Sequence, residues 1–118
     1  MFLRDEKYSI IGIQLVMIKQ KEECPFQAAM DLISGKWTMS IINTLMLGTL
    51  RFKQLERAID GINTRMLVKE LKLLESKGLV LRQAYATVPP TVEYSLTEKG
   101  RSLQTVIVAV QQWSLEQL

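Results

Sequence analysis

The sequence contains no histidine and only one cysteine, Cys24, among its 118 residues. Without histidine, the chain cannot form Ser–His–Asp or Cys–His catalytic groups, the usual zinc ligand sets, or the commonest general base near pH 7. A single cysteine excludes an intrachain disulfide and a cysteine-rich metal site, and it suits a reducing compartment. We therefore expect a protein that is not an enzyme and that holds neither a metal nor a cofactor.

The sequence also lacks a long hydrophobic run. Its longest apolar-rich stretch, residues 8–18, is broken by Ser9, Gly12 and Gln14, whereas a membrane-spanning helix needs about 20 apolar residues. A charged segment, residues 19–23, stands where a secretory signal would need a small-residue cleavage site. These features predict a soluble, cytoplasmic protein without a membrane partner.

The length is that of one domain, and an apolar fraction of 47% with 23% charged residues is ordinary for a globular chain. The formal charge of +3 permits a polyanionic partner. Residues 1–23 carry four basic and four acidic groups, and residues 97–118 carry two of each. Residues 51–82 carry eight basic and four acidic groups, so the positive charge is concentrated in the middle of the chain.

Residues 1–23 form a segment distinct from residues 24–118. A helix predicted over residues 6–22 has apolar residues on most of its surface, so it should pack on the body or on a second chain. On the second alternative, Ile11 and Leu15 belong to a dimer interface. Another alternative is that translation begins at Met17, in which case residues 1–16 are not part of the protein.

Helical spacing and glycine stops predict four helices between Pro25 and Gly78. Their predicted ranges are residues 26–33, 36–47, 53–59 and 63 or 64 to 77. Residues 50–52 are either a short strand or the start of a helix, and Asp60-Gly61 marks a turn. The fourth helix buries Leu67, Leu71 and Leu74.

After Gly78 the pattern changes to that of strands. Residues 79–86 form one strand, and Val92, Tyr94 and Leu96 alternate with polar residues in a second. Two prolines in the connecting loop, Pro89 and Pro90, predict a long, stiff connection rather than a tight turn. Thr97 caps a predicted last helix that runs to the C-terminus.

The predicted fold is therefore mainly α (α+β), a winged helix-turn-helix with additional N- and C-terminal dimerisation helices. Arg65, Lys69 and Lys72 are spaced i, i+4, i+7, so they project from one face of the fourth helix. A charged face is often merely solvated, but the preceding turn and following hairpin favour DNA binding. The predicted DNA-binding residues are Lys36, Arg51, Asn63, Thr64, Arg65, Val68, Lys69, Lys72, Arg82, Pro89, Pro90 and Thr91.

Several motifs give the chain a resemblance to HxlR-type regulators, which are similar to MarR-type regulators. The most specific motif is Pro89-Pro90 followed by Val92-Glu93-Tyr94-Ser95-Leu96-Thr97. The other matching motifs are Cys24-Pro25, Gly35-Lys36-Trp37, Leu50-Arg51-Phe52 with Leu55, Gly61-Ile62, Arg65-Met66-Leu67, Leu71 with Leu74-Glu75, Gly78-Leu79-Val80, and Gly100 with Leu103. The resemblance covers residues 24–113.

The resemblance implies a homodimer that binds double-stranded DNA at a palindromic operator. The helix from Asn63 would enter the major groove, and the hairpin around Pro89 and Pro90 would be the wing. Such proteins often have arginine after the second proline, so Thr91 implies a weaker electrostatic contact from the wing. The predicted dimer contacts in the last helix are Leu103, Val106, Ile107, Val110 and Trp113.

The resemblance also implies that Cys24 could sense an oxidant or electrophile, through an interchain disulfide or a thiol adduct. The alternative is a small buried residue at a helix start, which is common for a free cysteine. The inducer of such a regulator would be an oxidant or a small molecule, and the sequence does not identify it. A further alternative for the whole chain is a winged helix that binds protein instead of DNA.

Overall fold

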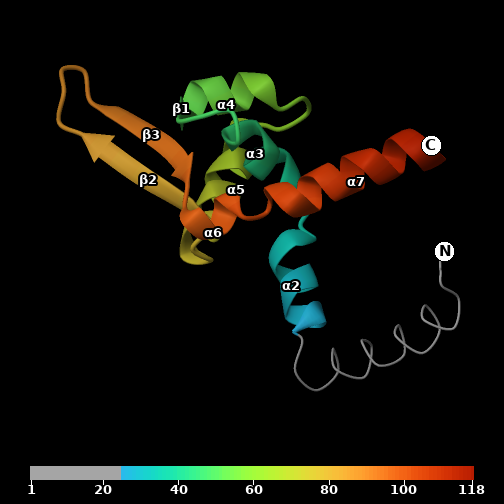
Figure 1. The fold of residues 1–118 in the computed structure, drawn as a ribbon. Helices are drawn as coiled ribbons and strands as arrows, with labels where there is room; N and C mark the ends of the chain where they lie inside the picture. Colours follow the sequence, from blue (N-terminus) through green and yellow to red (C-terminus); the bar gives the residue numbers. More distant parts are fainter. Residues whose placement is uncertain (1–24) are drawn as a thin grey trace, which may run out of the picture. The chain divides into compact units, whose positions relative to one another are not determined.

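The structure is a computed structural model that describes residues 25–118 (Figure 1). The predictions for Ile11, Leu15 and Cys24, and for the helix over residues 6–22, lie outside the described residues. The chain divides into two compact units after Ser34, so that helix α2 belongs to the first and residues 35–118 to the second. The second unit begins later than residue 24, where the sequence places the start of the winged-helix domain.

Helix α2 (Phe26–Ile33) confirms the helix predicted after Pro25. Its last turn closes when the Ser34 amide donates to the carbonyl of Met30 at 2.8 Å. None of its residues is buried, and Phe26 is 52% exposed. The apolar stripe of α2 is therefore open to solvent in the single chain.

Three helices form the centre of the second unit: α3 (Thr38–Leu45), α4 (Phe52–Ala58) and α5 (Thr64–Ser76). Their inward side chains are at most 2% exposed and make up half of the buried hydrophobic residues: Ile41, Ile42, Leu45, Leu55, Leu67, Leu71 and Leu74. The buried leucine stripe predicted for the fourth helix is confirmed. Helix α3 is two residues shorter at each end than predicted. At its C-terminal end the Met46 amide is shared between the carbonyls of Ile42 and Asn43, and the Leu47 amide donates to the Thr44 carbonyl, three residues back.

The turn between α4 and α5 depends on one glycine. Gly61 has a φ of +86°, a conformation that side chains with a Cβ rarely adopt. Ile62 follows it and is 9% exposed, so the turn is anchored in the core. The predicted Asp60-Gly61 turn therefore sets the direction in which α5 leaves α4.

The three strands form one antiparallel sheet in the order β1-β3-β2 (Figure 1). Strand β1 (Leu50–Arg51) pairs with β3 (Thr91–Leu96), and β2 (Val80–Tyr85) pairs with the other edge of β3. Residues 50–52 were predicted to be either a short strand or the start of a helix. They are both, because Leu50 and Arg51 form β1 and Phe52 begins α4. Tyr94 and Leu96 are buried as the alternation predicts.

The passage from α5 to β2 is closed by a Schellman motif. The Leu79 amide donates to the Leu74 carbonyl at 3.0 Å, and the Gly78 amide donates to the Glu75 carbonyl at 3.1 Å. Gly78 has a φ of +76°, as the motif requires. Thr97 ties β3 to this corner, since its hydroxyl donates to the Gly78 carbonyl at 2.6 Å. Helix α5 is thus fixed directly to the hairpin.

The prediction of one continuous last helix is wrong. The chain forms a short helix α6 (Glu98–Arg101) and, after a turn, α7 (Gln104–Gln117). At the junction the Leu103 amide donates to Gly100, three residues back, and the Ser102 hydroxyl donates to the Lys99 carbonyl. Side-chain bonds of this kind compete with a regular helix. The predicted cap is confirmed, because the Thr97 hydroxyl accepts from the Gly100 amide at 3.0 Å.

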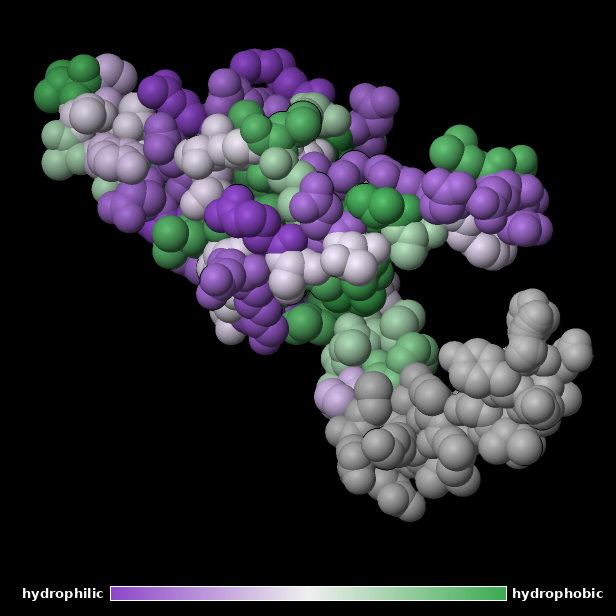
Figure 2. All heavy atoms as spheres, in the orientation of Figure 1, coloured by the Kyte–Doolittle hydropathy of each residue, from purple (hydrophilic) through white to green (hydrophobic). Residues whose placement is uncertain are grey.

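Helix α7 packs against α3 near its own start and extends away from the sheet (Figure 1). Ile107 is its only buried residue and is 7% exposed. Figure 2 shows hydrophobic surface along α7, including the end that extends furthest from the sheet. Its exposed large apolar residues are Val106, Val108, Val110, Trp113, Leu115 and Leu118.

Candidate nucleic-acid interface

The outer face of α5 is basic and open. Arg65, Lys69 and Lys72 are all exposed, on the side opposite Leu67, Leu71 and Leu74. Within residues 25–118 these three cations make no hydrogen bond or ion pair. Val68 lies among them and is 38% exposed. The face therefore presents uncommitted donors around one apolar group, which is the arrangement that base edges and a thymine methyl can meet.

The N-terminus of α5 is held by two side chains. The side-chain oxygen Oδ1 of Asn63 accepts from the Met66 amide at 2.8 Å, so Asn63 is the N-cap. The Thr64 hydroxyl donates to Oε2 of Glu56, which lies on α4. Both residues were predicted as DNA contacts, and both are exposed, but part of their hydrogen-bonding capacity is used within the helix-turn-helix.

Glu56 also interacts with Lys53, whose Nζ lies 3.4 Å from Oε1. The hydrogen bond from Thr64 is the main cause that lowers the pKa of Glu56, and Lys53 lowers it further, while burial raises it. Glu56 is not among the residues predicted for this site. Its i, i+3 spacing from Lys53 is visible in the sequence, but its contact with Thr64 spans the turn and depends on the angle between α4 and α5.

A hollow of about 350 Å³ lies between α5 and the sheet. Both apolar and charged side chains line it. Because some belong to α5 and others to the two strands of the hairpin, the hollow lies between the basic face of α5 and the hairpin. The lining residues are Phe52, Val68, Leu71, Lys72, Glu75, Arg82 and Tyr94. Two of the predicted DNA-binding residues, Arg82 of β2 and Lys72 of α5, therefore line the same hollow. Phe52, Glu75 and Tyr94 were not predicted to belong to this face.

The hairpin loop, residues 86–90, is exposed and includes Pro89 and Pro90. The Thr87 hydroxyl donates to the Pro89 carbonyl at 2.6 Å and lies 3.3 Å from the Thr91 hydroxyl. These contacts order the loop across its base, and the peptide between Val88 and Pro89 is cis. The predicted wing residues therefore stand at the far end of the hairpin from α5 (Figure 1).

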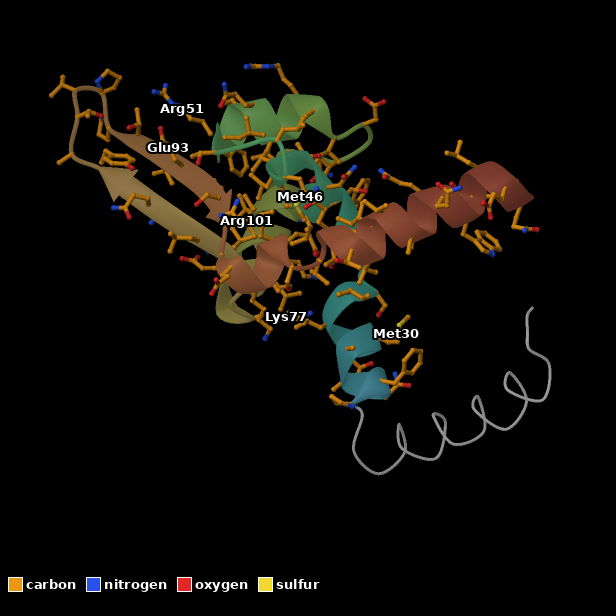
Figure 3. All side chains as sticks on the ribbon, viewed as in Figure 1. Met30, Met46, Arg51, Lys77, Glu93 and Arg101 are labelled. Atoms are coloured by element: carbon orange, nitrogen blue, oxygen red, sulfur yellow. The ribbon has the colours of Figure 1, made fainter. Side chains whose placement is uncertain are left out.

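Two predicted DNA contacts, Lys36 and Arg51, lie outside α5. Lys36 is exposed, with its Nζ 5.1 Å from the centre of the Trp37 ring. Arg51 is exposed on β1, where its register partner on β3 is Glu93, a pair that Figure 3 labels. Residues directly opposite in an antiparallel pair share one face of the sheet. The side chains of Arg51 and Glu93 therefore lie on the same face of the sheet, so that a carboxylate is the cross-strand neighbour of Arg51.

The predicted dimer contacts of the last helix differ in exposure. Val106, Val110 and Trp113 are 36%, 58% and 57% exposed in the single chain. Ile107 instead belongs to the core of its own chain, and Leu103 is half-buried at the start of α7. The structure therefore leaves three of the five residues free to meet a second chain.

Within residues 25–118, no helix is both long and apolar enough to cross a membrane. The same residues contain no group of three or more potential His, Cys, Asp or Glu ligands that could hold a metal ion.

Two helices joined by a glycine turn, with a hairpin directly after the second, define a winged helix-turn-helix protein. The sequence model of the HxlR-like helix-turn-helix family matches residues 32–118. The chain belongs to this family of transcriptional regulators.

Individual relatives agree with this assignment. The chain is 41% identical over 93 residues to the HTH-type transcriptional regulator YybR of Bacillus subtilis strain 168, covering 79% of this chain and 74% of YybR. A crystal structure of a MarR-family transcriptional regulator from Porphyromonas gingivalis W83 has a TM-score of 0.77 and 42% identity, covering 82% of this chain and 95% of that one. The redox regulator HypR in its oxidised form has a TM-score of 0.74 and 38% identity, covering 80% and 98%. These relatives are transcriptional regulators and not enzymes.

Proposed function

We propose that the protein is a sequence-specific DNA-binding regulator in which α5 enters the major groove and the β2–β3 hairpin acts as the wing. The observation that carries this proposal is the outer face of α5, where Arg65, Lys69 and Lys72 are exposed and have no partner within residues 25–118. Arginine can donate two hydrogen bonds to guanine, and lysine can contact phosphates or bases. Membership of the HxlR-like family supports the same function.

The regulator acts as a homodimer on a palindromic operator. A soluble chain that functions alone rarely exposes a large contiguous apolar patch, yet α7 leaves Val106, Val110 and Trp113 exposed at i, i+4, i+7 spacing. A two-fold dimer would place two copies of α5 in half-sites about one helical turn apart, or a multiple of it. The dimer role of Ile11 and Leu15, which lie outside the described residues, is part of the same proposal.

The test is the salt dependence of duplex binding. Each phosphate contact should add about 0.9 to the slope of log affinity against log salt concentration. The affinity of the full chain for duplex DNA should therefore fall steeply with salt concentration. Lys72→Ala should reduce the slope by about 0.9, the contribution of one phosphate contact. Lys99→Ala, which removes an exposed lysine from α6, is the matched control and should leave the slope unchanged. A flat dependence or no duplex binding would contradict the proposal and favour a winged helix that binds protein.

Regulation through Cys24 is the second part of the proposal. Cys24 is the only cysteine of the chain, and the similarity to the redox regulator HypR supports a response to oxidants. With one thiol in each chain, oxidation would give either an interchain disulfide, with two electrons and two protons passing to the oxidant, or an adduct on a single thiol.

Replacing Cys24 with serine tests this part. DNA binding by the wild-type protein should change after treatment with diamide, and addition of dithiothreitol should reverse the change. Cys24→Ser should bind DNA as the reduced wild type does and should show no response to diamide. A variant that still responds would exclude a thiol switch, and non-reducing electrophoresis would distinguish a disulfide from an adduct.

A further inference from the structure

The contact between Thr64 and Glu56 determines which hydrogen bonds Thr64 can offer to DNA. Thr64 is the first residue of α5 and is exposed. Its hydroxyl is directed to Oε2 of Glu56, eight residues earlier in the chain. The other carboxylate oxygen of Glu56 lies 3.4 Å from the Nζ of Lys53. The three side chains thus form a linked group at the point where α5 would meet a base.

The direction of the bond follows from the charge of Glu56. The contacts with Thr64 and Lys53 lower the pKa of Glu56, so its side chain is ionised at neutral pH. An ionised carboxylate has no proton and can only accept hydrogen bonds. The hydroxyl proton of Thr64 must therefore point at Glu56, in a charge-assisted bond that is roughly twice as strong as a neutral one.

A threonine hydroxyl has one proton and two lone pairs. With the proton held by Glu56, Thr64 Oγ1 can only accept from the DNA. Phosphate oxygens, guanine O6 and N7, and thymine O4 are themselves acceptors, so they do not match. The donors in the major groove are the exocyclic amino groups, N6 of adenine and N4 of cytosine.

We propose that Thr64 selects an amino base, adenine or cytosine, on the strand it contacts, and that Glu56 is the positioning residue that imposes this choice. The inference rests on the proposed function, because it requires the N-terminus of α5 to lie in the major groove. Glu56 itself does not touch the DNA. Lys53 balances its negative charge and is 73% exposed, which reduces the repulsion between Glu56 and the phosphates.

The experiment is selection of bound sequences from a random duplex library by the full chain and by four variants: Thr64→Val, Thr64→Ser, Glu56→Ala and Glu56→Gln. Sites selected by the wild type should carry adenine or cytosine at one position in each half-site. Thr64→Ser keeps the hydroxyl and should keep that preference. Thr64→Val should lose it at that position and retain the preferences elsewhere.

The Glu56 variants separate this inference from a merely structural role. With Glu56→Ala, Thr64 is free to donate, so the same position should now also accept guanine and thymine. Glu56→Gln should broaden it only in part, because the amide oxygen can still accept from Thr64 while the amide nitrogen can also donate to it. On synthetic duplexes, replacing the amino base with a keto base should weaken wild-type binding by roughly 2- to 13-fold, the net effect of one hydrogen bond, and this ratio should approach one in Thr64→Val.

Two results would overturn the inference. One is a wild-type site with guanine or thymine at the Thr64 position, and the other is an unchanged site in both Thr64→Val and Glu56→Ala. If the wild-type chain selects no sequence at all, the proposed function itself fails, and the inference fails with it. Circular dichroism of each variant confirms that a changed site does not come from loss of fold.

Discussion

Arg65 is the first cation on the outer face of α5, one residue after the N-terminal threonine. We expect Arg65→Ala to weaken specific binding by about 1–3 kcal/mol and to relax the base preference at one position. The reason is the loss of a two-pronged donor at a base edge. Competition between the selected site and random duplex measures the effect. An equal loss on both DNAs would assign Arg65 to phosphate instead.

Glu56 should make stability depend on pH in the acid range. Its pKa is lowered from the ordinary value of 4.5, chiefly by the hydrogen bond from Thr64. The folded chain therefore binds this proton more weakly than the unfolded chain. The stabilisation is fully present above the unfolded pKa and is lost as the pH falls through the lowered folded pKa.

The free energy of unfolding of the wild type and of Glu56→Gln, followed from neutral pH to about pH 3, measures this effect. Their difference should be constant near neutrality and should shrink below pH 4.5. Thr64→Val removes the donor, so it should flatten the same dependence. A difference that does not change across the whole range would contradict the role given to Glu56.

At the scale of elements, the packing of α6 depends on Gly100. A Cβ at this position would overlap the carbonyl oxygen of Leu79 and approach Cδ2 of Leu96 to 3.2 Å. Gly100→Ala should therefore destabilise the fold by about 1–3 kcal/mol, because the backbone at Leu79 or in α6 must shift. Chemical denaturation measures the loss. Lys99→Ala in the same short helix is the control and should change stability little, whereas equal effects of both would refute the close approach.

The sequence predicts most elements because their signals are local. The spacing of Leu67, Leu71 and Leu74 identifies the buried side of α5, and Gly78 marks its end. The division between α6 and α7 has no such signal. It lies beside the close approach of Gly100 to Leu79, residues that are 21 positions apart.

For the candidate site, too, the sequence predicts features within one helix but not contacts between elements. Helical spacing places Arg65, Lys69 and Lys72 on one face, and the structure agrees. The contact of Thr64 with Glu56 and the nearness of Arg82 to Lys72 depend on how elements pack against each other. Charge and period in the sequence therefore identify which residues face outward, but they do not identify their neighbours.

For the whole molecule, α7 should hold two chains together. Trp113 is 57% exposed and Val110 is 58% exposed. We expect Trp113→Asp to shift the protein from dimer to monomer at micromolar concentration, because a charge in an apolar interface must be desolvated. Analytical ultracentrifugation measures the assembly state.

The monomeric variant should also bind a full palindrome more weakly than the wild type, while a single half-site should be bound equally by both. Gln111→Glu places a charge on α7 without removing an apolar group and serves as the control. If Trp113→Asp stays dimeric, the interface lies elsewhere, and the N-terminal residues become the next candidates.

The strand order has a consequence for how DNA specificity can change between relatives. The helix-turn-helix leaves the sheet after Arg51, opposite Glu93, and returns at Val80, opposite Leu96. Both junctions are therefore fixed to β3, three residues apart, or roughly 10 Å along the strand. Residues 52–79 form a cassette, and substitutions on its outer face leave both of its ends fixed to β3. Exchange of this cassette between family members should transfer operator preference while α7 continues to determine the partner chain.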